Sequence, residues 1–398
     1  MLEESEARQR ILSLIPNVTA ESVRLDQALG RYAAVEVFAT LPLPPFDNSA
    51  MDGYAIHQSD CGAAGRKLLL TGGQPAGPDL GLEVSPGHCI RIFTGAPLPR
   101  GTGAIVMQED TIRSEDGSTI TLTESTDRGE FIRHAGADLC AGQRILTAGA
   151  PITPTRLALL ASQGFAALLC GPRPRACIVT TGNELIPPGQ TPTLAGQIYN
   201  SNGPMLGALL AGAGAETTAL HSPDDLPFLT KTLQDALTSH DVVVLAGGVS
   251  VGDHDFVKPA LQALGIPLQF WRIRMKPGKP FLFTTHAGKL IFGLPGNPAS
   301  AFVTALLFVL PALRKLAGAS ESGALPVTTP ATLTAAADNP GDRPHYLRGH
   351  YQFSTASFTP VGLQQSHALA ALASSNALLR LAPDALAPAG SVHPVVLF

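Results

Sequence analysis

The chain has 398 residues, of which 15% are charged and 45% hydrophobic, and its formal net charge is −4. A single hydrophobic core stops growing at roughly 250 to 300 residues, so the length predicts two to four domains. The charges are spread along the sequence without a basic stripe of the kind that follows a phosphate backbone. The composition therefore argues against a nucleic acid as partner.

The N-terminus and the longest apolar run both argue against membrane targeting. The first residues, MLEESEARQRILSLI, begin with acids and continue as an amphipathic helical pattern, whereas a secretory signal has a basic start and an apolar core. The run AFVTALLFVLPAL is predicted to be too short for a bilayer and contains Pro311. The five cysteines form no CxxC pair and are expected to be small buried hydrophobes in a reducing cytosol. We expect a soluble cytoplasmic protein without a membrane partner.

The N-terminal half predicts a helix and a small β domain. Residues 1 to about 40 fit a first helix and a segment that ends in strand-like alternation. From about 55 to 140, short alternating segments are separated by Gly and Pro, which is typical of a small β domain. A helical pattern follows in PTRLALLASQGF, behind a Thr-Pro pair that suits a helix N-terminus. The linker GPRPRA then predicts a domain boundary.

The C-terminal half alternates strands and helices before it returns to short strands. Segments such as ACIVTT, DVVVLAGG and PFLFTT alternate with helical ones such as GPMLGALLAGAGA, which predicts a parallel, doubly wound sheet. A long helix is expected at PASAFVTALLFVL, and another small β domain from about residue 325. Trp271 and the phenylalanines are expected in the core rather than on a stacking platform.

Two loops of the expected α/β domain combine glycines with acids at the carboxyl ends of strands, where open α/β sheets bind ligands. One is TTGNEL, and the other is GGVSVGDHDF, which lacks the spacing of a Walker A or dinucleotide-binding loop. Its first two glycines would let the backbone approach a ligand closely. An ordinary polar strand-to-helix loop remains the alternative for the second stretch. The residues concerned are Thr180, Thr181, Gly182, Glu184, Gly247, Gly248, Ser250, Asp253, His254 and Asp255.

Two further loops predict anion binding. MKPGKP holds Lys276 and Lys279 three residues apart on a proline-stiffened turn, and two ammonium groups that close repel each other unless an anion lies between them. GLPGNPAS leads from glycines and Asn297 into a helix N-terminus, which attracts anions. A solvated basic turn and a helix cap without a ligand are the respective alternatives.

Acids beside lysines favour a phosphate ester held with a divalent metal. Mg²⁺ prefers one or two carboxylates together with substrate phosphates, which Glu184 and Asp255 could supply. His134 and His254 could also be metal ligands, although a lone histidine beside a loop is more often a polar surface residue.

The motifs resemble, in order and over nearly the whole chain, those of the molybdopterin molybdenumtransferases, the bacterial MoeA group to which the gephyrin E domain is related. The resemblance is carried by PPFDNSAMDGYA, RIFTGAPLPRGTGAIV, RHAGADLCAGQ, TTGNEL, DVVVLAGGVSVGDHDFVK, MKPGKP and GLPGNPAS, with weaker matches at RPHYLRG and QSHALAALASSNAL. It implies a multidomain α/β plus β protein whose α/β domain is similar to molybdopterin adenylyltransferases. The implied domains are a segmented connecting domain at 1–43 and 141–170, an inserted β domain at 44–140, the α/β molybdopterin-binding domain at 171–322 and a C-terminal β-barrel-like domain at 323–398.

The resemblance also implies a reaction and a set of site residues. The family inserts molybdenum from molybdate into adenylylated molybdopterin and releases AMP with Mg²⁺. It works as a homodimer whose active site lies between the α/β domain of one subunit and the β and C-terminal domains of the other. The residues implied as catalytic are Asp52, Glu184, Asp255, Lys276 and Lys279, with Glu184 and Asp255 holding the metal. Those implied as substrate-binding are Thr94, Asp138, Asp224, Ser250, Gly247, Gly248, Pro295, Asn297, Arg348 and Ser366.

Two other functions compete with the transferase. A non-catalytic pterin carrier would use the same pocket without turnover, and an adenylyltransferase would make the adenylylated intermediate from ATP. The presence of Glu184, Asp255 and both lysines favours the enzyme over the carrier, because cleavage of a phosphoric anhydride depends on positioning and on charge neutralisation. The absence of a separate nucleotidyltransferase domain counts against the adenylyltransferase.

Overall fold

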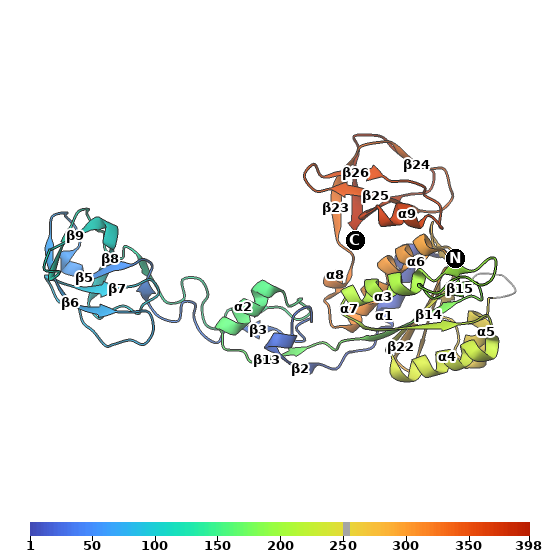
Figure 1. The fold of residues 1–398 in the computed structure, drawn as a ribbon, viewed down its shortest axis with the longest axis horizontal. Helices are drawn as coiled ribbons and strands as arrows, with labels where there is room; N and C mark the ends of the chain where they lie inside the picture. The colour runs from blue at the N-terminus through green and yellow to red at the C-terminus, as the bar shows by residue number, and fades with distance from the viewer. Residues whose placement is uncertain (250–254) are drawn as a thin grey trace. The chain divides into compact units, whose positions relative to one another are not determined.

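A computed structural model of the chain describes residues 1–249 and 255–398 (Figure 1). These residues form two compact units, one made of Met1–Val35 and Thr147–Phe398 and the other of Glu36–Leu146. Ser250, Asp253 and His254, which the sequence singled out, lie outside the described residues. The four predicted domain boundaries stay a prediction.

The unit Glu36–Leu146 is built on a six-stranded sheet with the strand order β8-β5-β7-β6-β10-β9. Strand β5 begins at Gly53, where a Cβ atom would lie 1.9 Å from the carbonyl oxygen of Val106 on β8, so only glycine fits. The sheet confirms the predicted β fold of this stretch. Its strands are β5 Gly53–His57, β6 Lys67–Gln74, β7 His88–Ile92, β8 Thr102–Met107, β9 Thr111–Arg113 and β10 Thr119–Leu122, and the smaller elements are β3 Val37–Phe38, β4 Asn48–Ser49, β11 Ile132–Arg133, β12 Arg144–Leu146, η2 Gln58–Asp60 and η3 Gln108–Asp110.

A second six-stranded sheet forms the α/β part, with the order β17-β14-β18-β22-β21-β19. The first four strands are parallel, whereas β21 and β19 are antiparallel. The predicted parallel, doubly wound sheet is therefore confirmed for these four strands, and β21 and β19 depart from it. The reason is the turn between β21 and β22, where Ala287 and Gly288 both have positive φ and close a two-residue hairpin that is too short for a crossover helix. The strands are β14 Arg175–Thr181, β17 Glu216–Ser222, β18 Val242–Ala246, β19 Phe270–Trp271, β21 Leu282–His286 and β22 Lys289–Leu294.

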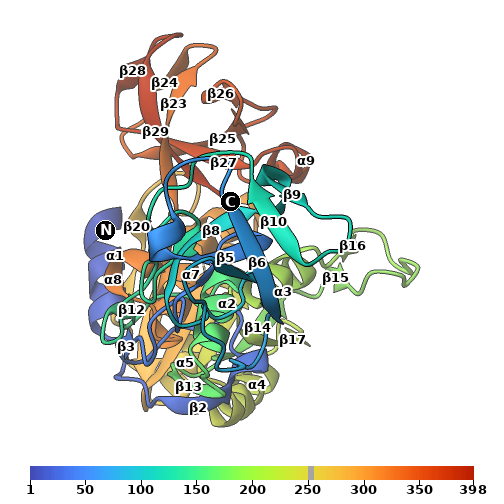
Figure 2. The same cartoon turned by 90° about the vertical axis from the view of Figure 1, so that its left-hand side faces the viewer.

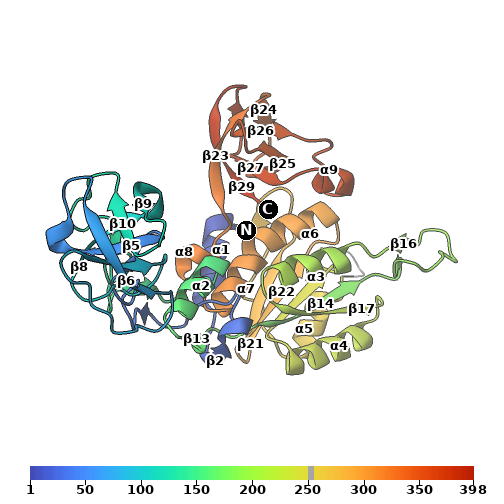
Figure 3. The same cartoon turned by 60° about the vertical axis from the view of Figure 1, so that its left-hand side comes forward.

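Helices cover both faces of this sheet (Figures 1 and 3). One face packs against α1, α3 and the long helix that begins at Pro298, and the other packs against α4 and α5. Every residue of β18 is buried, as expected for a central strand that is covered on both sides. The helices are α1 Glu4–Ser13, α3 Asn202–Gly212, α4 Leu226–Ser239 and α5 Val257–Ala263.

The long helix is longer than its apolar run predicted. Segments α6 Pro298–Thr304, a π-helical stretch Ala305–Val309 (η4) and α7 Leu310–Leu316 follow one another without a break. Pro311 cannot donate a backbone hydrogen bond, which accounts for irregular geometry near it. Among the described residues this is the one helix long and apolar enough to cross a membrane, because it extends beyond the apolar run AFVTALLFVLPAL at both ends. In an 18-residue window, however, 83% of it is buried inside the protein, as in a core helix.

The C-terminal region forms a closed barrel with the order β23-β26-β25-β27-β29. The barrel confirms the predicted β-barrel-like domain, and the predicted multidomain α/β plus β fold class is confirmed with it. Its elements are β23 Thr328–Leu333, β24 Ala337–Asn339, β25 His345–Gln352, β26 Ser357–Pro360, α9 Leu369–Ala373, β27 Ala377–Leu381, β28 Ala385–Ala387 and β29 Val392–Leu397, preceded by α8 Glu321–Ala324.

The remaining elements include the helix α2 and short strands that pair in twos. The predicted helix α2, Pro154–Ser162, is confirmed, and the Thr153 side chain caps it by accepting from the backbone N–H of Arg156. The loop between β15 and β16 extends away from the sheet (Figure 2). Cys140 is exposed, so the prediction that all cysteines are buried is wrong for that residue. The elements are β1 Leu2–Glu3, β2 Glu21–Arg24, η1 Leu25–Gln27, β13 Ala167–Cys170, β15 Leu185–Ile186, β16 Ile198–Tyr199 and β20 Ile273–Arg274.

Candidate functional site

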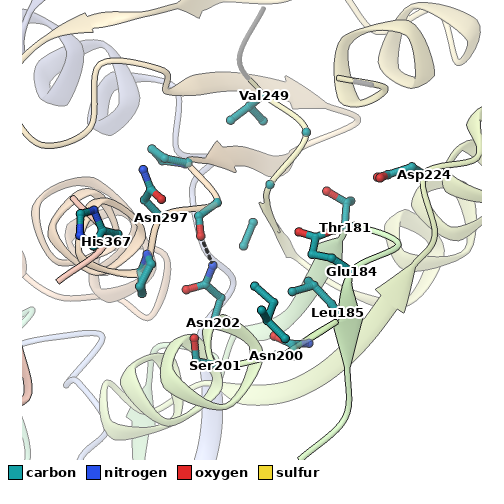
Figure 4. A pocket seen from close by; sticks show the side chains of 18 of the residues that line it. Thr181, Glu184, Leu185, Asn200, Ser201, Asn202, Asp224, Val249, Asn297 and His367 are labelled. Carbon is teal, nitrogen blue, oxygen red and sulfur yellow. Dashed lines mark hydrogen bonds between the residues drawn. The ribbon is translucent and has the colours of Figure 1, made fainter. Parts of the chain in front are cut away.

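A cavity of about 700 Å³ lies at the carboxyl ends of β14 and β18 (Figure 4). We call it the acid-amide cavity, because three carboxylates and three asparagine amides line it. Of the predicted residues it brings together Glu184, Asp224, Asp255, Gly247, Gly248, Pro295 and Asn297. Its other lining residues include Thr181, Leu185, Ile198, Tyr199, Asn200, Ser201, Asn202, Val249, Pro280, His367 and Leu369.

The glycines of the second loop are required by packing within the protein. Gly247 has φ +104°, and a Cβ atom there would lie 2.7 Å from Oγ1 of Thr181. A Cβ atom on Gly248 would lie 3.1 Å from the same oxygen and 3.2 Å from Cγ2 of Val257. The turn is therefore pressed against the end of β14, which brings the loop after β18 beside the loop after β14.

The acidic side chains lie at the starts of neighbouring loops that follow the strands. Asn183 and Asp224 exchange hydrogen bonds, since the N–H of Asn183 donates to Oδ2 of Asp224 at 3.3 Å and the N–H of Asp224 donates to Oδ1 of Asn183 at 3.0 Å. The Glu184 carboxylate folds back over Gly182, where an added Cβ atom would lie 2.4 Å from it. The loops after β14 and β17 thus present their carboxylates to one cavity.

Sequence reasoning missed the amides on the α3 side of this cavity (Figure 4). Asn202 donates to the carbonyl oxygen of Gly296 at 2.6 Å, and Asn200 donates to Oγ1 of Thr180 at 2.8 Å. Oδ1 of Asn202 and Oγ1 of Thr181 are buried without a hydrogen-bond partner among the described residues. The sequence IYNSN just before a helix could have indicated these residues, because Asn and Ser favour helix N-termini.

A second cavity, of about 430 Å³, adjoins the first, and we call it the lysine cavity. Lys276, Lys279 and Arg343 line it, so both predicted lysines are brought together there. The two cavities share Pro280, Pro295, Asn297 and His367. The other residues lining the lysine cavity are Met275, Pro277, Gly278, Ser300, Gln364, Gln365 and Ser366.

The barrel of the same chain holds the lysine turn. The N–H of Lys276 donates to the carbonyl of Pro344 at 2.8 Å, and its carbonyl accepts from the N–H of Tyr346 at 2.8 Å. Arg343 also donates to the carbonyl of Met275 at 3.3 Å. These backbone hydrogen bonds join the barrel to the lysine turn within one chain, and the contribution of a second subunit to the site stays a prediction.

The turn that precedes α9 closes the lysine cavity. Oγ of Ser366 accepts from Nδ2 of Asn297 at 2.9 Å, and the carbonyl of Ser366 accepts from the N–H of Ala299 at 3.1 Å. This turn therefore caps a free amide in the first turn of α6. The sequence left a helix cap as the alternative to a bound anion at this helix N-terminus. For the Ala299 amide the structure contains the cap.

Arg348 acts on the same turn from inside the barrel. It is fully buried, and its Nη2 donates to the carbonyls of Leu363 at 2.8 Å and Gln365 at 3.1 Å. Its Nε and Nη1 have no hydrogen-bond partner among the described residues. Burial lowers the pKa of Arg348 from its ordinary value. The guanidinium thus holds the turn rather than lining either cavity.

The other predicted residues belong to the unit Glu36–Leu146. Oδ1 of Asp52 accepts from the N–H of Thr94 at 2.7 Å and from its hydroxyl at 2.8 Å, and these bonds lower the pKa of Asp52. Asp138 lines a cavity of about 560 Å³ together with His134. Nδ1 of His134 lies 3.2 Å from Oδ2 of Asp47, so the imidazole has a carboxylate neighbour at the surface.

Oxygen ligands for a hard cation are present in the acid-amide cavity. Among the described residues no group of three or more His, Cys, Asp or Glu is arranged to hold a metal ion. Mg²⁺ does not need such a cage, because it takes one or two carboxylates and completes its shell with phosphate oxygens and water. Glu184 and Asp255, which line one cavity, fit that requirement.

The fold and the paired cavities define a multidomain α/β protein with a candidate ligand site at the carboxyl ends of its parallel strands. Three family models cover most of the chain: "MoeA N-terminal region (domain I and II)" over residues 2–164, "Probable molybdopterin binding domain" over 177–315 and "MoeA C-terminal region (domain IV)" over 330–398. The chain belongs to the molybdopterin molybdenumtransferase family. It is accordingly a transferase of molybdenum cofactor biosynthesis.

Relatives and solved structures match over nearly the full length. The molybdopterin molybdenumtransferase of Haemophilus influenzae is 36% identical over 96% of this chain and 94% of its own length. That of a Nostoc species is 35% identical over 94% of this chain and 91% of its own. The crystal structure of the molybdopterin biosynthesis MoeA protein from Pyrococcus horikoshii OT3 superposes with a TM-score of 0.84 at 28% identity, covering 100% of both chains.

Proposed function

We propose that the chain transfers molybdenum from molybdate to adenylylated molybdopterin, with Mg²⁺-dependent release of AMP. The observation that carries the proposal is that a cavity lined by acids and amides adjoins one lined by lysines, with four residues common to both. A ligand that spans them would place a phosphate group at the shared edge. The pterin and nucleotide would occupy the larger cavity, and molybdate the smaller one.

The lysine cavity suits a tetrahedral dianion. Lys276 and Lys279 repel each other across a small cavity, and a bound dianion removes that repulsion. The turn that carries them is tied to the barrel by two backbone hydrogen bonds, so the ammonium groups need little reorganisation when the anion arrives. We assign these lysines the tasks of binding molybdate and of stabilising charge on the phosphate.

The acid-amide cavity suits the nucleotide side of the substrate. Glu184 and Asp255 would hold Mg²⁺, which supplies charge neutralisation to the phosphate oxygens when it is bound. Asp224 would orient the loop that carries Glu184 through its hydrogen bonds to Asn183. Pro295 and Asn297 would contact substrate at the edge shared with the lysine cavity, and Gly247 and Gly248 would admit the ligand close to the backbone.

The remaining site residues belong to the same proposal. We assign Ser366 to the wall of the lysine cavity, and Arg348 to the turn that presents it. Asp52, Thr94 and Asp138 would be presented by the β domain of a second subunit in a homodimer. The enzyme would work in the cytoplasm.

The test is an assay of AMP release by purified protein supplied with Mg²⁺, molybdate and adenylylated molybdopterin. Release of AMP that requires both Mg²⁺ and molybdate supports the proposal. Tight binding of the substrate without AMP release would point instead to a pterin carrier. Consumption of ATP with free molybdopterin would point to an adenylyltransferase.

A further inference from the structure

Trp271 is the single tryptophan of the chain and lies on the edge strand β19. The sequence predicted it in the core, but the structure leaves it half-buried, so that prediction is wrong. The fully buried phenylalanines 281, 283, 292 and 308 fill the core of the sheet. The prediction is wrong for the exposed phenylalanines, which are Phe38, Phe46, Phe93, Phe228, Phe353 and Phe398. Trp271 packs beside the second core, on the face covered by α4 and α5.

The indole N–H holds one end of the loop that leads to Asp255. Nε1 of Trp271 donates to the carbonyl oxygen of Val249 at 3.0 Å. Val249 is 2% exposed and lines the acid-amide cavity, and it packs so closely on β22 that a Cβ atom at Gly293 would lie 2.7 Å from its Cγ1. The hydrogen bond therefore fixes the backbone where the strand β18 gives way to the loop.

The indole ring is associated with the other end of the same loop. Nζ of Lys258 lies 3.2 Å from the ring centroid, and Cζ of Arg272 lies 3.8 Å from it. Both are cation–π contacts. Lys258 follows Asp255 by three residues, and burial lowers its pKa while the charge of Asp255 raises it. The two ends of the loop also meet directly, since the N–H of Val257 donates to the carbonyl of Gly248 at 3.3 Å.

We propose that Trp271 is a positioning residue that holds both ends of the loop carrying Asp255, and thereby sets the carboxylate in the acid-amide cavity. One end is held by the hydrogen bond from the indole N–H to the carbonyl of Val249, and the other by the cation–π contact of the ring with Lys258. Trp271 lines neither the acid-amide cavity nor the lysine cavity. The inference rests on the proposed function for its kinetic test, whereas its structural test needs no activity.

The test uses Trp271→Phe, which keeps an aromatic ring but removes the N–H, and Trp271→Leu, which removes both. Ile266→Val is the matched control, because Ile266 is 3% exposed in the same core and the change costs stability while leaving the Trp271 side chain unaltered. For Trp271→Phe we expect kcat for AMP release to fall and the half-saturating Mg²⁺ concentration to rise, each about fivefold, as for one lost hydrogen bond. The KM for molybdate should stay within about twofold, since the lysine cavity is unchanged. Trp271→Leu should show the larger effect.

Hydrogen exchange at the Val257 amide provides the readout without activity. It should quicken about fivefold in Trp271→Phe and stay unchanged in Ile266→Val, because opening of the loop ends breaks its bond to Gly248. Unchanged exchange, or kinetics of Trp271→Phe equal to those of Ile266→Val, would overturn the inference. If the unaltered protein releases no AMP, the proposed function fails, and the exchange result alone then decides the inference.

Discussion

The two adjoining cavities are built in different ways. The acid-amide cavity is formed by loops that follow the strands β14, β17, β18 and β22, where any parallel sheet gathers its loops. The lysine cavity is formed by a turn that the barrel holds through the hydrogen bonds between Lys276 and residues 344 and 346. The first cavity follows from local strand-loop patterns, and the second depends on a contact between distant parts of the chain. Carboxylates line the first cavity, whereas lysines and an arginine line the second. A substitution can therefore change the charge of one cavity without changing that of the other.

The substitutions with the largest expected effect test whether the two cavities bind different ligands. Lys279→Ala should lower kcat/KM for AMP release about 100-fold and raise the KM for molybdate, because it removes a cation from the anion site. Asp255→Asn should lower the rate by a similar factor but raise the Mg²⁺ requirement instead. Initial rates measured against each ligand in turn check the contrast. Lys231→Ala and Asp235→Asn, on an exposed ion pair of α4, are the matched controls. If both variants shifted the KM for molybdate and the Mg²⁺ requirement equally, the two cavities would act as one site, contrary to the prediction.

A second prediction concerns the barrel side of the lysine cavity. Burial, with Lys276, Arg348 and Arg343 nearby, lowers the pKa of His345 to about 4. The unfolded chain, with a pKa near ~6.5, binds more protons between these values, so the free energy of unfolding should fall by up to about 3 kcal/mol as pH drops from ~6.5 to ~4. His345→Gln should remove that part of the pH dependence in denaturant unfolding curves.

The control for His345→Gln is the same substitution at the exposed His286, measured in the same unfolding curves. If the free energy of unfolding of His345→Gln fell with acid as much as that of the unaltered protein, the imidazole would not be held neutral beside the lysine turn.

A third prediction compares Thr181, which lines the acid-amide cavity, with its chain neighbour Thr180, which does not. The hydroxyl of Thr180 accepts from Asn200 at 2.8 Å, whereas Oγ1 of Thr181 is buried without a partner among the described residues. Thr180→Val should therefore cost about 1–2 kcal/mol of unfolding free energy, and Thr181→Val should cost less than about 0.5 kcal/mol. Urea unfolding of both variants is the measurement. A larger loss in Thr181→Val would contradict the assignment of partners.

The smallest effect belongs to the other unit. The pKa of Asp52 is lowered first by the backbone N–H of Thr94 and then by its hydroxyl. Thr94→Ala should raise that pKa part of the way back, because only the hydroxyl is lost. Stability contributed by the ionised carboxylate, present above the unfolded pKa, would then be lost at a higher pH as acid is added. Carboxyl NMR titration of Asp52 checks the shift, with Ser118→Ala, which acts on Asp116, as control.

Local pattern predicted most of the fold. The apolar run of β18, the Thr-Pro start of α2 and the short strands of the β domain were all recognisable from sequence. The direction of β21 was not, because it depends on the two positive φ angles at Ala287 and Gly288, and alanine does not indicate such a turn.

The candidate site was predictable in part for the same reason. Acids and glycines at strand ends indicated the acid-amide cavity, whereas Asn202 was missed because its importance comes from a bond to Gly296, 94 residues away. The sequence did not predict that the barrel of the same chain holds the lysine turn, since the hydrogen bond from Lys276 to Pro344 has no local sequence pattern. The resemblance to the family identified Ser366 and Arg348, but it did not predict that Arg348 would be buried beneath the turn that it holds.

Calorimetric titration of molybdate into protein saturated with AMP and Mg²⁺ tests the central claim, that two adjoining cavities form one site with separate places for nucleotide and oxyanion. We predict that molybdate binds beside AMP, with an affinity within about threefold of that in its absence. Displacement of one ligand by the other would contradict the account, because it would mean that both compete for a single cavity.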